Sequence, residues 1–142
     1  MQKFFLIFLL YLVSQISSLA NDRDVRLNQL FNELKVNKAK VASIAEQEIW
    51  KIWSTHPTDS NLTAKLEEGS ECVRNQQLIK AIDIFTEVIS LDQNWAEAWN
   101  KRATVFYLIG EFKKSQNDID KVLAIEARHF GALAGQGLVN IQ

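Results

Sequence analysis

The sequence predicts an all-α protein built from antiparallel helix pairs, and three observations lead to this fold class. The 142 residues include only five glycines and one proline, too few for the many turns of an all-β protein. Apolar residues recur every three or four positions along most of the chain, which is the spacing of one helix face. The pattern also repeats after 34 residues, which indicates helix pairs that stack and share a continuous core.

The first 20 residues are typical of a secretory signal peptide. Lys3 precedes ten apolar residues, 4–13, and a polar stretch then ends in Ser18-Leu19-Ala20. A basic start, a short apolar run and a small-x-small end predict cleavage after Ala20 and a periplasmic or secreted protein. The alternative is a membrane anchor formed by residues 4–20, although this apolar run is about half of the ~20 residues that cross a bilayer.

Two helical patterns follow the signal segment and predict an N-terminal hairpin. Apolar positions at helical spacing occur in residues 25–34 and again in residues 41–53. The polar segment 54–61 then separates them from the rest of the chain. We therefore expect a hairpin over residues 21–58, either a degenerate repeat or a cap, and a second helical domain over residues 59–142.

The 34-residue period is clearest in this second domain. Small residues recur at Gly69, Ala103 and Gly137, where they would let neighbouring helices approach closely, and Gln76 matches Gly110. Polar or glycine-containing breaks separate the apolar helical stretches. These offsets divide the domain into two repeats and a partial one, at about residues 62–95, 96–129 and 130–142.

Residues 96–129 resemble a tetratricopeptide repeat (TPR), a helix-turn-helix unit of 34 residues. They contain an early tryptophan (Trp99), a small residue four positions later (Ala103), a following aromatic residue (Phe106) and a glycine in the turn (Gly110). The preceding repeat lacks the tryptophan, and neither repeat has the usual closing proline. The resemblance implies a short TPR-like right-handed solenoid that binds another protein.

In this family the first helices of successive repeats line a concave groove for extended peptides or partner helices. The resemblance therefore implies a set of partner-binding residues: Thr63, Leu66, Ser70, Glu97, Asn100, Thr104, Tyr107 and Leu108. Tyr107 and Asn100 are the strongest candidates, because a rigid amphipathic ring anchors interfaces and an amide can pair with a peptide backbone. Solvent-facing positions without a ligand are the alternative. Leu66 stands where some members place the lysine that clamps a C-terminal carboxylate.

Residues that could perform catalysis or bind a metal are sparse, so we expect no enzyme, no cofactor and no metal site. His56 and His129 fall in predicted turns far apart, without a cysteine or carboxylate spacing that completes a site. Cys72 matches the core position of Phe106, which favours a buried, inert thiol. The acidic residues within 67–71 indicate a solvated face. A small hydrolase-type enzyme that uses these acids or His129 is the remote alternative.

The charge balance gives the chain no overall basic excess. Sixteen basic and seventeen acidic residues give a net charge of −1, so we expect no nucleic-acid partner and no membrane contact beyond the export signal. The function favoured by the sequence is an exported, non-catalytic module that binds a peptide or helix of a partner protein. Solenoids normally end in a helix with a polar outer face, whereas residues 130–142 form an apolar helical stretch. The alternative function is therefore a structural piece that self-associates through residues 130–142.

Overall fold

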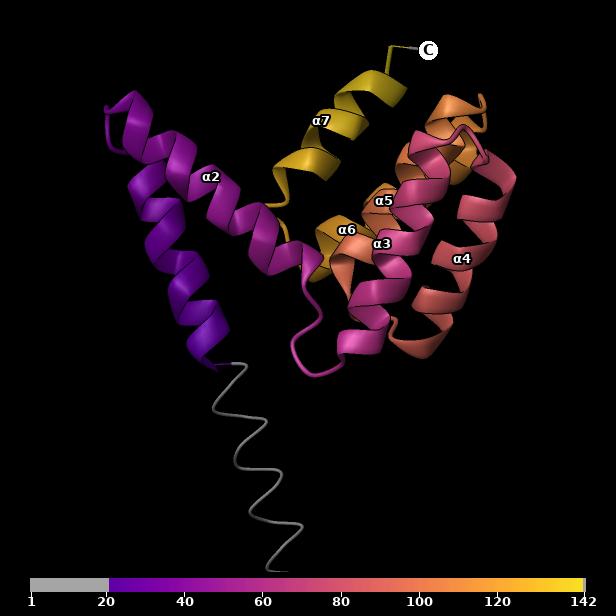
Figure 1. Ribbon diagram of the computed structural model, residues 1–142. Coiled ribbons are helices and arrows are strands. Elements are labelled where there is room, and N and C mark those ends of the chain that lie inside the picture. Colours follow the sequence, from indigo (N-terminus) through magenta and orange to yellow (C-terminus); the bar gives the residue numbers. More distant parts are fainter. Residues whose placement is uncertain (1–20, 142) are drawn as a thin grey trace, which may run out of the picture. The chain divides into compact units, whose positions relative to one another are not determined.

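The computed structural model describes residues 21–141, so the expected signal segment lies outside the described residues. From residue 21 to residue 141 the chain is helical and contains no strand, which confirms the all-α class. The chain divides into two compact units, with the boundary between Asp59 and Ser60, and each unit is described by itself (Figure 1). None of the helices in the described part is long and apolar enough to cross a membrane.

The N-terminal unit is a helical hairpin. Residues 21–34 form its first helix and α2 (Ala39–Ser54) its second. The ring of Trp53 lies 5.5 Å from that of Trp50 in an edge-to-face arrangement and 6.1 Å from that of Phe31. Aromatic pairs and aliphatic burial together give this hairpin a core of its own. The buried apolar residues of that core are Leu27, Leu30, Ala45, Ile49 and Trp53.

Between residues 60 and 141 the C-terminal unit contains five helices. These are α3 (Ser60–Arg74), α4 (Leu78–Leu91), α5 (Ala96–Leu108), α6 (Phe112–Ile125) and α7 (Phe130–Val139). Each helix packs against the next along the chain, and α5 also packs against α3 and α7 (Figure 1). The unit therefore consists of the pairs α3–α4 and α5–α6, with the first helices of successive pairs in contact and α7 continuing that series.

The turns inside the two pairs have the same backbone geometry. Gln76, between α3 and α4, has a φ of 58°, and Gly110, between α5 and α6, has a φ of 80°. Glycine adopts this left-handed conformation without a steric penalty, whereas a residue with a Cβ does not. The 34-residue period therefore extends to the turns, with glycine at only one of the two equivalent positions.

Close packing within the first pair depends on Gly69. A Cβ at this position would lie 2.9 Å from both Cδ1 and Cζ of Phe85, so only hydrogen fits. At Gly137, one α7 position expected to be closely packed, a Cβ would meet no atom within 4 Å. The close-packing expectation is therefore wrong for Gly137, because no neighbouring atom approaches that side of α7.

A partly buried arginine ties together three helices of the C-terminal unit. Arg102 of α5 donates from Nε and Nη2 to the carboxylate of Asp118 on α6, at 2.8 and 2.9 Å. Its Nη1 donates to Oγ1 of Thr86 on α4 at 2.9 Å, and its guanidinium lies 5.0 Å from the ring centre of Trp99. This bidentate pair with a stacked guanidinium orients α5 between its neighbours.

Candidate functional site

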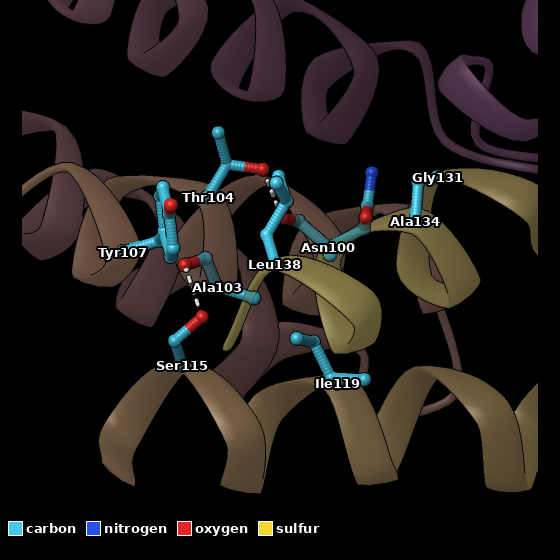
Figure 2. Close-up of a pocket in the computed structure, with 10 residues that line it drawn as sticks. Asn100, Ala103, Thr104, Tyr107, Ser115, Ile119, Gly131, Ala134 and Leu138 are labelled. Atoms are coloured by element: carbon cyan, nitrogen blue, oxygen red, sulfur yellow. Dashed lines mark hydrogen bonds between the residues drawn. The ribbon is translucent and has the colours of Figure 1, made fainter. Parts of the chain in front are cut away.

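A pocket of about 150 Å³ lies among α5, α6 and α7 (Figure 2). It opens to solvent, its apolar walls come from all three helices, and none of its lining residues carries a formal charge. The small residues in these walls leave space that larger side chains would fill. The lining residues are Asn100, Ala103, Thr104, Tyr107, Ser115, Ile119, Gly131, Ala134, Gly135 and Leu138.

Three of the predicted partner-binding residues meet in this pocket. Asn100, Thr104 and Tyr107 lie one helical turn apart on α5, and all three line it. Leu108 is exposed at the end of α5 but lies outside the lining. Thr63 and Ser70, both half-buried on α3, also lie outside it. Their role in binding a partner stays a prediction.

The structure places two further predicted residues inside the unit. Leu66 is 2% exposed and belongs to the core cluster that contains Phe85. Glu97 is 0% exposed and takes part in a buried polar network. This corrects the expectation that they face a groove, because neither side chain is available to a partner.

The buried carboxylate of Glu97 contacts three polar side chains. Nε2 of His129 lies 3.0 Å from Glu97 Oε2, and Nδ2 of Asn100 donates to the same oxygen at 3.1 Å. Nζ of Lys101 lies 3.4 Å from the other oxygen, Oε1, which accepts no hydrogen bond. Because an ionised carboxylate can only accept, the amide nitrogen of Asn100 must face Glu97.

His129 joins this network to the start of α7. Its Nδ1 accepts the backbone N–H of Ala132 at 3.2 Å, so His129 is the N-cap of α7. With Nδ1 as an acceptor, the ring proton of the neutral form lies on Nε2, which faces Glu97. Both ring nitrogens are thus engaged, and His129 acts as a capping residue that links α7 to α5.

The other reactive side chains have structural surroundings. Nδ1 of His56 accepts the backbone N–H of Asp59 at 2.9 Å. Among the described residues, no group of three His, Cys, Asp or Glu side chains is placed to hold a metal ion. Cys72 is buried in the core, which confirms its predicted position. The hydrogen bond and charge of Arg74 lower the pKa of Glu71, and both side chains are exposed, as predicted for a solvated face.

Two hydroxyl groups of residues that line the pocket donate hydrogen bonds to backbone carbonyls. Oγ1 of Thr104 donates to the carbonyl of Asn100 at 3.0 Å, and Oγ of Ser115 donates to the carbonyl of Ala103 at 2.9 Å (Figure 2). Each hydroxyl carries a single hydrogen, so both oxygens can only accept further bonds. The ring of Tyr107 lies 5.5 Å from that of Phe112, which holds it at the edge of the pocket.

The α7 wall of the pocket was not among the predicted site residues. It includes Ala134 and Leu138, which lie 34 positions after Asn100 and Thr104. These are the same repeat positions, carried one unit further along the chain. Extending the 34-residue period from Asn100 and Thr104 would therefore have predicted Ala134 and Leu138 as site residues.

The stacked helix pairs define a helical-repeat protein. No protein-family model matches the chain. A TPR repeat-containing protein of Rhizobium etli is 36% identical over 116 residues, which cover 80% of this chain and 56% of that relative. Sperm-associated antigen 1 of Rattus norvegicus is 28% identical over 89 residues, which cover 58% of this chain and 10% of that relative. The chain is thus similar to proteins with tetratricopeptide repeats, and it spans about half the length of its Rhizobium relative.

Proposed function

We propose that the protein is a non-catalytic interaction module that binds an extended or helical segment of a partner protein at the pocket beside α5. The observation that carries this proposal is the convergence of Asn100, Thr104 and Tyr107 on one solvent-accessible pocket. The polar side chains can set the register of a bound segment, while the apolar walls from α6 and α7 can hold one of its side chains.

Replacement of Tyr107 tests this function. Residues 21–142, the chain expected after cleavage, would first be used as bait in the exported fraction to isolate a partner. A peptide from that partner would then be titrated calorimetrically into the protein. Tyr107→Ala is expected to weaken the affinity for this peptide by about tenfold or more, as for an aromatic anchor in an interface. Lys121→Ala, an exposed change on α6 outside the pocket, is the control and should alter the affinity by less than about twofold.

Asn100 is a less direct probe of binding than Tyr107. Asn100→Ala also removes a hydrogen bond from the buried carboxylate of Glu97, so it changes stability as well as the pocket. Equal affinity of wild type and Tyr107→Ala for the partner peptide would contradict binding at this pocket. An unchanged oligomeric state in both variants would show that any loss is local to the pocket.

We also propose that the protein is exported, from the signal-like layout of residues 1–20. The intact mass of the protein recovered from its native host tests this proposal. A chain that begins at Asn21 supports export with cleavage after Ala20. A chain that retains residues 1–20 and partitions into membranes supports the anchor instead.

Assembly through α7 is a second candidate function, favoured by the apolar surface of that helix. Leu133 and Leu138 are each 47% exposed, and Ile141, just beyond the helix, is 75% exposed. Exposed apolar side chains that gather into a contiguous patch commonly mark an interaction site. Sedimentation of wild type and Leu133→Glu at tens of micromolar, a range that detects roughly micromolar contacts, would test it. A monomer in both proteins would exclude self-association.

A further inference from the structure

We infer that the pocket beside α5 selects a partner segment that presents N–H donors next to one medium-sized apolar side chain, and that it rejects a terminal carboxylate. This inference rests on the proposed function, because it names the chemistry of the segment that would occupy the same pocket. It follows from the hydrogen-bonding roles of two oxygen atoms on residues that line the pocket.

The first of these acceptors is Oδ1 of Asn100. The carboxylate of Glu97 holds the amide nitrogen at 3.1 Å, so the orientation of the amide is determined by a buried acceptor. Oδ1 accepts no hydrogen bond from any described residue, although Asn100 lines the pocket. Glu97 and His129 therefore act as positioning residues, which keep this oxygen available as an acceptor for a ligand.

The other acceptor is the hydroxyl oxygen of Thr104. Its hydrogen is committed to the backbone carbonyl of Asn100 on α5 at 3.0 Å, and Thr104 is an exposed residue of the pocket wall (Figure 2). The hydroxyl of Ser115 also donates to a backbone carbonyl, but Ser115 is only 1% exposed and is not available to a ligand. A bound segment with N–H groups can therefore donate to two oxygens whose roles are set by the protein itself.

A carboxylate would find poor compensation in the same pocket. The only side-chain donors among the lining residues are the second N–H of Asn100 and the hydroxyl of Tyr107, and no lining residue is a cation. A buried carboxylate needs a cation or several donors to replace its hydration. The nearby cation Lys101 is paired with Glu97, which is itself a carboxylate. Hydrogen-bond and charge complementarity thus both favour a neutral donor.

Three small probes that share one apolar side chain separate these possibilities. They are N-acetyl-leucinamide, N-acetyl-leucine and N-acetyl-leucine N,N-dimethylamide, which end in an N–H donor, a carboxylate and a neutral group without a donor. Each would be titrated into isotope-labelled full-length protein near neutral pH, with the NMR amide signals of Thr104, Ala134 and Gly135 as the readout. We expect the primary amide to bind about fivefold more tightly than either other probe.

A matched pair of variants assigns the effect to one acceptor. Thr104→Val removes the hydroxyl at nearly constant shape and should weaken the primary amide by about threefold while leaving the carboxylate probe unchanged. Thr104→Ser keeps the hydroxyl and should stay within about twofold of wild type. Thr104 is exposed, so both variants should retain the fold.

The outcomes distinguish this inference from the proposed function. If N-acetyl-leucine or the dimethylamide binds as tightly as the primary amide, the donor selectivity is overturned and the binding site remains. If no probe shifts the pocket signals at millimolar concentration, both the selectivity and the pocket as a binding site are overturned. Equal effects of Thr104→Val and Thr104→Ser would overturn the assignment of the acceptor.

Discussion

At the scale of single residues, Gln76 and Gly110 show how a repeat can tolerate different side chains at one backbone geometry. Both residues terminate the first helix of a pair with a positive φ, of 58° and 80°. Glycine has no Cβ to clash there, whereas glutamine holds a conformation that L-residues rarely adopt. The two sites therefore allow a comparison, within one protein, of the free energy that a positive φ costs with and without a Cβ.

Exchange of these two residues should change stability in opposite directions. Gly110→Gln is expected to lower the free energy of unfolding by about 1 kcal/mol, the cost of a left-handed backbone with a Cβ. Gln76→Gly should raise it by about 0.5 kcal/mol. The relief of backbone strain in the folded protein exceeds the stabilisation that the unfolded chain gains from the extra conformational entropy of glycine. Urea unfolding followed by circular dichroism measures both. The same sign for both variants would contradict the matched geometry.

Gly69 and Gly137 occupy the same repeat position but have different surroundings. Gly69→Ala is expected to destabilise the protein by about 1–3 kcal/mol, because the new methyl group would overpack against Phe85. Gly137→Ala should stabilise it by up to about 1 kcal/mol, since alanine is the better helix former and space is open there. Chemical denaturation compares the two. A neutral Gly69→Ala would show that Phe85 can move aside.

At the scale of elements, the attachment of α7 depends on a polar link as well as on apolar packing. His129 caps α7 through Nδ1 and reaches Glu97 on α5 through Nε2, and both side chains are fully buried. A buried hydrogen-bonded pair of this kind is weak as a source of net stability, but the removal of one partner is costly. The link therefore holds α7 in place beside the pocket.

Replacement of His129 should loosen α7 before the other helices. His129→Ala is expected to lower the free energy of unfolding by about 2–4 kcal/mol. The helix cap is lost, and the buried carboxylate of Glu97 keeps fewer hydrogen-bond partners. His129→Asn can still cap the helix but cannot reach Glu97, so it should recover about 1 kcal/mol. Hydrogen exchange of residues 132–139 is the measurement. Equal protection in wild type and His129→Ala would contradict the role of this link.

At the scale of the whole molecule, each of the two units has its own apolar core. The hairpin buries Leu27, Leu30 and Trp53, while the C-terminal unit buries a separate cluster around Phe85. Separate cores allow one unit to open while the other stays folded. The distribution of stability along the chain should follow this division.

Local destabilisation of the C-terminal unit tests the division. Gly69→Ala should reduce amide protection in residues 60–139 and leave residues 21–54 unchanged, because the overpacked site lies within one core only. Hydrogen exchange with mass spectrometry reports both segments in one experiment. A parallel loss of protection in both segments would show that the chain unfolds as a single cooperative unit.

Much of the secondary structure could be predicted from the sequence, because its signals are local. The spacing of apolar residues predicted helices on both sides of Gln76 and Gly110, and the turns occur at these residues. The resemblance to a tetratricopeptide repeat implied that Asn100, Thr104 and Tyr107 face a groove, and these three line the pocket. Periodicity over a few turns contains this information without reference to the rest of the fold.

The sequence alone therefore determined the helices, their breaks, the repeat period and the face of α5 that lines the pocket. Only the tertiary structure decided that Glu97 is buried against His129, 32 residues away, instead of facing a partner. It also decided that Gly69 is crowded while Gly137 is open. The physical reason is that burial depends on which distant helix packs against a face, and a local pattern of residues does not contain that contact.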